Sequence, residues 1–285
     1  MEAKNSLVKT QKQTFSAFLS TDAMKKKINE MVGGEKGQQF ITAIISAVST
    51  NPQLAECDHS TILSAALVGQ ALNLSPSPQL GQYYMVPFND NKRGCKVAQF
   101  QIGYKGYIQL AIRSGYYKKL NVLAIKEGEL IKYDPLNEDI EVKLIEDEEK
   151  REQAKTIGYY AMFEYLNGFR KTLYWTKKHM EAHAEKYSMG YKAHKGYTFW
   201  EKDFDGMAYK TMLRQLISKW GIMSIDMQKA MESDMAEIKE DGTYEYVDNE
   251  YEVTESIQEE TQPEQQQVTE EQSKSTDEDD PFLQK

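Results

Sequence analysis

The chain has 285 residues, of which 40% are hydrophobic and 28% are charged. This composition fits a globular protein and excludes fibrous and wholly disordered classes. It contains no run of about 18 apolar residues, so no membrane-spanning helix is expected, and no signal peptide is expected at the N-terminus. The two cysteines, Cys57 and Cys95, stand apart, which argues against a disulfide framework or a cysteine-rich zinc site. A reducing cytoplasm is the default location.

The charge is distributed unevenly along the chain. The net charge of the whole chain is −9. Residues 231–285 hold 19 acidic and 3 basic residues, whereas residues 1–230 hold 32 basic and 25 acidic residues. A basic body favours a polyanionic partner, although an ordinary globular body with a solubilising acidic tail fits the same counts.

The pattern of apolar and turn residues predicts an α+β fold, with a short antiparallel sheet and hairpins packed on helices. Residues 1–20 are polar and unpatterned and are expected to form a flexible arm. Helices are predicted at 23–32, 38–49, 60–73, 104–113, 176–187, 199–220 and 224–238. Strands are predicted at 82–88, 96–102, 119–126, 140–145, 156–166 and 169–175. Residues 240–285 are too poor in apolar side chains to offset the entropy of ordering, so a disordered acidic tail is expected.

Several catalytic classes lack their motifs. No GxxxxGK[ST] loop is present, which argues against a nucleotide-driven motor. His179 and His183 lie one helical turn apart, a spacing that can bind zinc, but the residue after the first histidine is Met180 rather than the glutamate of metalloproteases. No nuclease pattern organises the many carboxylates. The sequence therefore indicates no catalytic residue, no metal site and no cofactor, and it does not decide whether Mg²⁺ is needed.

Basic residues form stripes on two predicted helices. Lys105, Gln109 and Arg113 share one face of the helix at 104–113. Lys210 and Arg214 lie one turn apart, opposite an apolar stripe on the helix at 199–220. Like charges one turn apart repel each other, and a bound phosphate would remove that cost. Aromatic residues lie between further cations, a mixture that suits single-stranded nucleic acid. An ordinary solvated helix face explains the same stripes.

Three blocks of sequence, taken together and in this order, form a recognisable pattern. The first is Ile102-Gly103-Tyr104-Lys105-Gly106-Tyr107 with Leu110-Ala111 and Arg113-Ser114-Gly115. The second is Trp200-Glu201 with Met207, Lys210-Thr211 and Arg214, through Lys219. The third is Leu63–Pro87, which contains NLSPSPQLGQYYMVP and continues into Phe88. Together these blocks resemble the RecT family of phage single-strand annealing proteins, and the resemblance covers about residues 40–230.

The resemblance implies a function and a set of contacts. It implies a protein, not an enzyme, that binds single-stranded DNA without ATP, anneals it to a complementary strand in homologous recombination and forms rings or helical filaments. The annealing domain is expected at 21–239, with a core like that of the annealing-protein superfamily. The candidate DNA-binding residues are Tyr104, Lys105, Gln109, Arg113, Lys118, Lys119, Lys171, Lys210, Thr211 and Arg214. A passive single-strand coat protein and, less favoured, a metal-dependent nuclease are the alternatives.

The resemblance also implies partners. These are single-stranded DNA, the annealed duplex, further copies of the chain and a phage exonuclease, in the cytoplasm of a bacterial host and away from any membrane. The segment Asp277-Glu278-Asp279-Asp280-Pro281-Phe282 is similar to the acidic tip of bacterial single-stranded DNA-binding protein. We therefore expect the tail to dock host single-stranded DNA-binding machinery or to compete with DNA for the basic body, although a merely solvated tail fits too.

Overall fold

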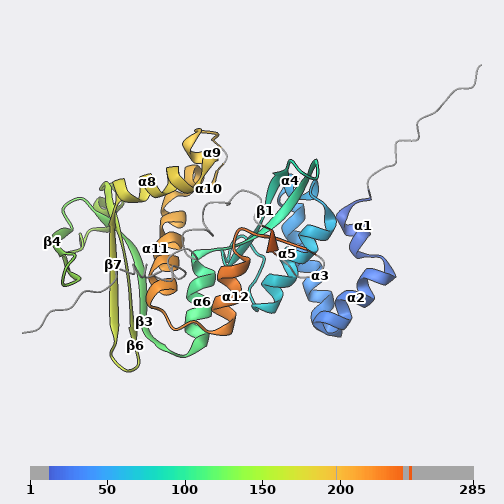
Figure 1. The fold of residues 1–285 in the computed structure, drawn as a ribbon, viewed down its shortest axis with the longest axis horizontal. Helices are drawn as coiled ribbons and strands as arrows, with labels where there is room; N and C mark the ends of the chain where they lie inside the picture. The colour runs from blue at the N-terminus through green and yellow to red at the C-terminus, as the bar shows by residue number, and fades with distance from the viewer. Residues whose placement is uncertain (1–12, 197, 240–243, 246–285) are drawn as a thin grey trace, which may run out of the picture. The chain divides into compact units, whose positions relative to one another are not determined.

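The structure is a computed structural model that describes residues 13–196, 198–239 and 244–245. Its N-terminal part is helical (Figure 1). The helices are α1 (Phe15–Leu19), α2 (Asp22–Val32), α3 (Gly34–Ser49), α4 (Pro52–Ala55) and α5 (His59–Ala71). Asp58 caps α5 by accepting a hydrogen bond from the Ser60 amide at 2.9 Å. The predicted helices at 23–32, 38–49 and 60–73 are therefore confirmed.

The predicted flexible arm at 1–20 is wrong where the structure describes it. Phe15 and Leu19 of α1 are 4% and 0% exposed. The rings of Phe15 and Phe18 each lie 5.4 Å from the His59 ring, between centroids. The spacing i, i+3, i+4 places these three apolar residues on one helical face, and that face packs on the core. Residues 1–12 lie outside the described part of the chain.

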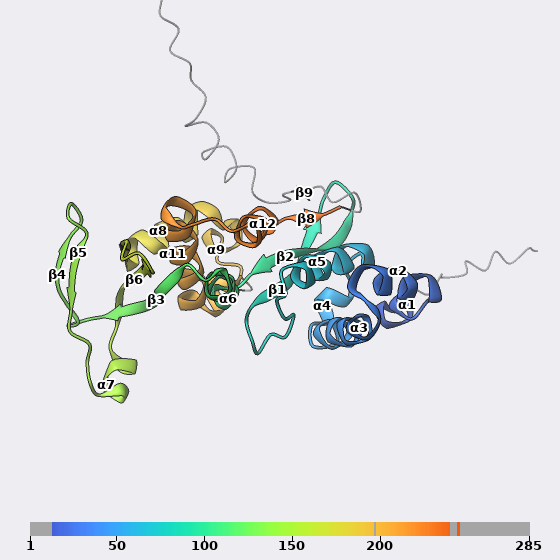
Figure 2. The same cartoon turned by 90° about the horizontal axis from the view of Figure 1, so that it is seen from below.

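The first sheet is a hairpin of β1 (Tyr83–Asp90) and β2 (Cys95–Ile102). The strands are antiparallel and pair Tyr83 with Ile102. Strand alternation points Ala98, Phe100 and Ile102 into the core, and β2 packs on α5 (Figure 2). The intervening residues Gln99 and Gln101 therefore belong to the opposite face of the hairpin.

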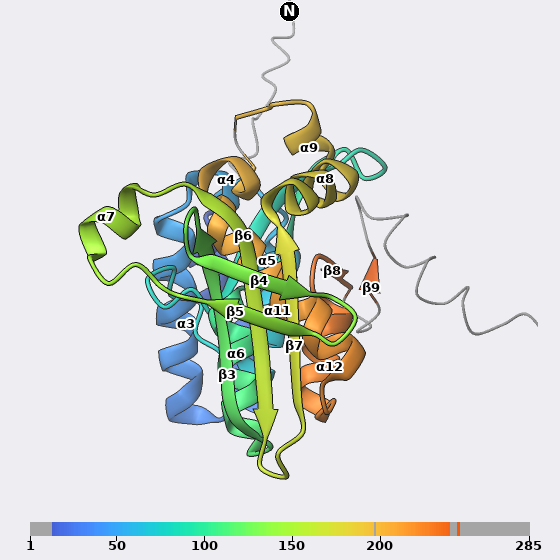
Figure 3. The same cartoon turned by 90° about the vertical axis from the view of Figure 1, so that its left-hand side faces the viewer.

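The second sheet has the strand order β3 (Tyr117–Lys126), β6 (Thr156–Tyr165), β7 (Arg170–Thr176), and it is antiparallel throughout. A smaller hairpin of β4 (Leu130–Asp134) and β5 (Asp139–Val142) crosses one face of this sheet. The helices α8 (Lys177–Tyr187) and α11 (Phe204–Trp220) cover the other face (Figure 3). Tyr133 and Tyr174 join hairpin and sheet at a ring distance of 5.0 Å. The short exposed helix α7 (Glu148–Gln153) leads into β6.

Helix α6 (Tyr104–Ser114) connects the first hairpin to the three-stranded sheet. Within the described residues, five helices and two short strands follow that sheet. They are α8 (Lys177–Tyr187), α9 (Met189–Lys192), α10 (Phe199–Lys202), α11 (Phe204–Trp220), α12 (Ile225–Ser233), β8 (Glu237–Ile238) and β9 (Tyr244–Glu245). The mixture of helices with small antiparallel sheets confirms the predicted α+β class.

Helix α11 is buried on two sides. Ala208, Met212 and Leu216 pack in the core under the three-stranded sheet. Leu213 and Ile217 pack in the other core, with α5, α6 and the β1–β2 hairpin. A helix that is apolar on two sides joins the elements it lies between. This explains why the face opposite the predicted apolar stripe is not open to solvent.

Two predicted helices and one strand differ between the sequence prediction and the structure. The helix at 199–220 is interrupted at Asp203, whose carboxylate accepts from the Gly206 amide at 2.9 Å and starts α11. The helix at 224–238 ends at Ser233, because the Met235 amide donates to the Phe100 carbonyl at 2.8 Å and brings the chain to β2. Strand β4 was not predicted. Tyr244–Glu245 pair with β8, and the rest of the predicted tail at 240–285 lies outside the described residues.

Candidate nucleic-acid interface

The glycines of the Gly-Tyr-Lys-Gly segment allow two backbones to cross. A Cβ atom on Gly103 would lie 2.2 Å from the Gly81 carbonyl oxygen, and one on Gly106 would lie 2.2 Å from the Gln82 carbonyl oxygen. The Gly103 amide donates to Gln82 O at 2.9 Å. Only glycine fits so close a contact. The crossing sets the start of α6 and leaves Lys105 exposed beside Gly81.

The predicted stripe on α6 is divided between solvent and protein. Lys105 is exposed and lies 5.9 Å from the centre of the half-buried Tyr104 ring. Gln109 is half-buried. Arg113 donates to the Leu72 carbonyl at 2.7 Å and the Asn73 carbonyl at 3.3 Å. Arg113 is exposed, but its guanidinium is hydrogen-bonded to the C-terminal end of α5, whose last carbonyls need donors. Of the two cations in the stripe, Lys105 is the one that makes no such bond within the described part of the chain.

The prediction that Lys210 lies on an open face of its helix is wrong. Lys210 is 5% exposed, and its Nζ lies 2.9 Å from Oδ1 of Asp234, which is 1% exposed. The same Oδ1 accepts from the Ile102 amide at 3.1 Å. Thr211 is buried beside it, and Arg214 is half-buried. In this structure the Lys210 ammonium holds α11 to the segment after α12 instead of facing solvent.

The remaining predicted cations lie on the three-stranded sheet. Lys118 and Lys119 are exposed on β3 and contact the Glu164 carboxylate at 2.6 and 3.6 Å. Lys171 pairs with Glu138, and its Nζ lies 3.5 Å from the centre of the Trp220 ring. These three lysines thus lie on the three-stranded sheet, whereas Lys105 lies on α6, and each of the three already contacts an acidic side chain.

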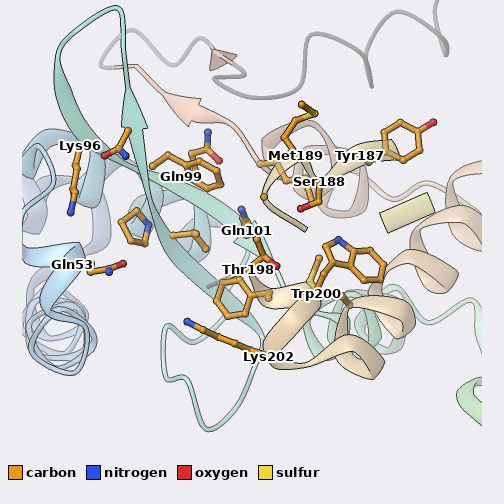
Figure 4. A pocket seen from close by; sticks show the side chains of 18 of the residues that line it. Gln53, Lys96, Gln99, Gln101, Tyr187, Ser188, Met189, Thr198, Trp200 and Lys202 are labelled. Carbon is orange, nitrogen blue, oxygen red and sulfur yellow. The ribbon is translucent and has the colours of Figure 1, made fainter. Parts of the chain in front are cut away.

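A cleft of about 660 Å³ lies between the β1–β2 hairpin and the helices α9 and α10. We call it the β1–β2 cleft. One wall contains residues 86–89, 91, 96, 99 and 101, with residues 51 and 53 beside them. The other wall contains residues 187–190, 198–200, 202, 207 and 235. Figure 4 shows Gln99 and Gln101 on the hairpin and Thr198, Trp200 and Lys202 across the opening.

The charged residues of the β1–β2 cleft are cationic. Among the described residues that line it there are two lysines and no carboxylate. Lys202 is exposed and has no ion-pair partner within the described part of the chain. Lys96 pairs with Glu56 at 2.6 Å, outside the lining. A cleft lined by one sign of charge concentrates ligands of the opposite sign, so this cleft attracts an anionic ligand.

Aromatic side chains connect the cleft to Lys105. Phe199 is 40% exposed, and its ring lies 5.7 Å from that of Tyr84. Burial, and then the Asp203 carboxylate, raises the pKa of Tyr84, so its hydroxyl keeps its proton at neutral pH. A Cβ on Gly81 would lie 3.0 Å from Tyr84 Oη and 3.4 Å from Lys105 Cδ. Phe199, Tyr84 and Lys105 therefore extend the surface of the cleft.

The histidine pair of α8 belongs to a column of rings. His179 stacks on Trp175 at 4.2 Å, and His183 lies 4.5 Å from Tyr187, both between centroids. His179 is exposed and His183 is half-buried. The described residues contain no group of three or more His, Cys, Asp or Glu side chains placed to hold a metal ion.

Sequence reasoning missed the residues of the cleft. The strand at 96–102 was predicted, and its alternation of Gln99 and Gln101 with Ala98, Phe100 and Ile102 was the available signal for a polar second face. Lys202 and Phe199 were assigned to a continuous helix.

Among the helices that the structure describes, none combines the length and the apolar composition that a membrane span requires.

The fold and the cleft define an α+β protein with a cationic, carboxylate-free cleft beside a β-hairpin. Comparison with protein-family models matches residues 38–255 to the RecT family, so the chain belongs to that family. It is 43% identical over 245 residues to the uncharacterized protein YqaK of Bacillus subtilis strain 168, covering 86% of this chain and 78% of that protein. It is 28% identical over 224 residues to protein RecT of Escherichia coli K12, covering 78% and 80%. Membership of this family supports a role in single-strand annealing and DNA recombination.

Proposed function

We propose that the protein binds single-stranded DNA in the β1–β2 cleft and anneals it to a complementary strand without ATP. The observation that carries the proposal is the cleft itself, which holds lysines and aromatic rings and no carboxylate in a chain of the RecT family. Phosphates attract cations, and aromatic rings stack on bases of any sequence. A site of this composition suits a strand that is held without regard to its sequence.

Lys105 and Lys202 are the lysines that we assign to phosphates. Both are exposed, and within the described residues neither has an ion-pair partner. Of the other predicted contacts, Tyr104 and Gln109 lie on the helix of Lys105, whereas Arg113 and Lys210 are engaged by the protein. Each phosphate neutralised on a single strand contributes about 0.7 to the slope of log affinity against log salt.

Annealing needs no chemical energy source under this proposal. Stacking of DNA contributes about 1.4 kcal/mol per base-pair step, so ten matched steps release about 14 kcal/mol before costs. The protein has to hold one DNA strand while the complementary strand samples base pairing with it. The sequence also lacks the phosphate-binding loop of nucleotide-driven motors.

Self-association is part of the proposal, since it extends the DNA-binding surface from copy to copy. Large apolar side chains are exposed on two segments, the β6–β7 turn and the end of α11 with the residues after it. They are Leu166 and Phe169 in the first segment, and Trp220, Ile222, Met223 and Ile225 in the second. The Tyr165 hydroxyl connects the two segments, because it donates to the Trp220 carbonyl and accepts from the Ile222 amide. Exposed apolar patches of this kind mark interaction sites. We assign this one to a second copy.

The proposed setting is the cytoplasm of a bacterial host, in recombination and repair of phage or prophage DNA. A phage exonuclease would expose the strand, and the annealed duplex would be the product. The acidic tail would dock the host single-stranded DNA-binding machinery. Deleting residues 246–285 should abolish that docking and leave oligonucleotide annealing intact. Unchanged docking after the deletion would remove the tail from the proposal.

The test of the annealing role is duplex formation between two complementary oligonucleotides, followed by fluorescence without ATP. We expect the wild-type protein to accelerate annealing and the Lys105→Ala/Lys202→Ala variant to lose most of that acceleration. Lys27→Ala, which removes an exposed cation from α2, is the matched control and should behave as wild type.

The same assay separates the alternatives. Tight binding without acceleration would indicate a passive coat protein. Strand cleavage that a chelator stops would indicate a metal-dependent nuclease. Annealing that depends on added nucleotide would contradict ATP independence, and repeating the reaction with and without Mg²⁺ determines whether the cation is needed.

A further inference from the structure

The hairpin wall of the β1–β2 cleft contains a buried polar group without a partner. Gln99 is 1% exposed, and its Nε2 has no hydrogen-bond partner among the residues that the structure describes. An amide N–H that loses water without gaining an acceptor destabilises the folded state, so buried donors are generally satisfied. Because Gln99 lines a cleft, a bound molecule is the natural source of the missing acceptor.

The side chains that share the cleft with Gln99 favour a neutral acceptor. Val86, Trp200 and Met207 are apolar and line the same cleft. Placing a charged phosphate among apolar groups carries a large desolvation cost, whereas a carbonyl oxygen or ring nitrogen carries a much smaller one. A nucleobase has such neutral acceptors on its edges. The inner part of the cleft therefore suits a base better than a phosphate.

The outer part of the cleft has the complementary chemistry. Lys202 supplies an exposed ammonium group and Phe199 an exposed ring. A phosphate beside Lys202 stays hydrated, and a base that passes Phe199 can stack on it. The volume of about 660 Å³ falls within the range of about 300–1,000 Å³ of small-molecule pockets. The cleft has room for a base and its sugar.

We propose that the β1–β2 cleft takes one base out of the bound strand, with Gln99 Nε2 donating to that base and Lys202 contacting its phosphate. The proposal rests on the proposed function, which places single-stranded DNA in this cleft. Every base offers acceptors, so the site does not select a sequence. An unpaired base is withdrawn at lower cost than a paired one. The site thus distinguishes single strands from duplex and keeps one base per copy unpaired until the strand leaves.

The test compares a 20-nucleotide thymidine strand with a 20-nucleotide abasic strand of the same charge, each followed by fluorescence anisotropy. We expect the wild-type protein to bind the thymidine strand at least about 5-fold more tightly, in line with the loss of one stacked base. Gln99→Leu should reduce this ratio several-fold. Gln153→Leu, on the exposed surface of α7, is the matched control and should keep the wild-type ratio.

The outcomes distinguish a failure of the base site from a failure of the proposed DNA-binding function. Equal binding of both strands by the wild-type protein would overturn the base site while leaving DNA binding intact, and that comparison needs no variant. Equal ratios in wild type and Gln99→Leu would overturn the assignment of Gln99. Failure to bind the thymidine strand at all would contradict the proposed function itself. If Gln99→Leu does not fold, Phe199→Ala at the rim should lower the ratio instead, and an unchanged ratio there would overturn the site.

Discussion

Replacing Lys210 with methionine separates a structural role from a DNA-binding role for this residue. The change keeps an unbranched side chain and removes the ammonium group. Asp234, which is 1% exposed, would then keep, among the residues that the structure describes, only the Ile102 amide as a donor to its carboxylate, at 3.1 Å. Removing one partner of a buried ion pair costs about 3–5 kcal/mol. We expect a loss of that size in the free energy of unfolding.

The double variant Lys210→Met/Asp234→Asn gives the matched comparison. Asparagine keeps an oxygen that can accept from the Ile102 amide, but it leaves no uncompensated charge in the interior. Replacing both charges of a buried pair is often far less costly than removing one. We therefore expect the double variant to recover more than half of the lost stability, which a double-mutant cycle measures directly.

Urea unfolding followed by circular dichroism is the assay. With a slope of about 1–3 kcal/mol per molar urea, the single variant should unfold at a midpoint at least about 1 M lower. A surface lysine would change stability by no more than about 0.5 kcal/mol. If Lys210→Met is as stable as the wild type and instead loses DNA affinity, the structural assignment is refuted.

Three further predictions follow from the described contacts. Gly103→Ala places a Cβ atom 2.2 Å from the Gly81 carbonyl oxygen and should cost about 1–3 kcal/mol in a thermal melt; an unchanged melt would contradict the close crossing. Burial, aided by neighbouring positive charges, lowers the pKa of His183 from 6.5 to about 4. Its contribution to stability is therefore present above pH 6.5 and falls as the pH drops from 6.5 to 4; His183→Gln should weaken that dependence in urea titrations, and an identical pH profile would contradict the assignment. Lys105→Ala should lower the salt slope of single-strand binding by about 0.7, whereas an unchanged slope would place Lys105 away from phosphates.

The α+β class and most elements could be predicted because local signals determine them. Asp58 and Thr176 cap the predicted starts of α5 and α8, and Gly115 in the left-handed conformation ends α6. Contacts from distant segments could not be predicted. Asp234 is 24 residues from Lys210 and 132 from Ile102, so a helical projection of α11 alone placed the lysine on an open face.

The candidate site was predicted in part. Lys105 lies exposed on its predicted helix. The glycines on either side of it, Gly103 and Gly106, lie against the backbone of Gly81 and Gln82, and this close contact sets the start of the helix. The β1–β2 cleft depends on the packing of the hairpin against residues 187–190 and 198–202, which are about 100 residues away in the chain. Such pairings follow from the tertiary fold. The alternation around Gln99 indicates a polar strand face, but it does not show which segment packs opposite that face. The place of Gln99 and Lys202 in one cleft could therefore not be predicted.

Hydrogen–deuterium exchange of the full chain, with and without a thymidine oligonucleotide, tests the central claim most directly. Binding in the β1–β2 cleft predicts slower exchange in β1, β2 and residues 198–202, with little change in β3 and β7. Protection confined to the three-stranded sheet, around Lys118, Lys119 and Lys171, would contradict the account and move the DNA to the other side of α11.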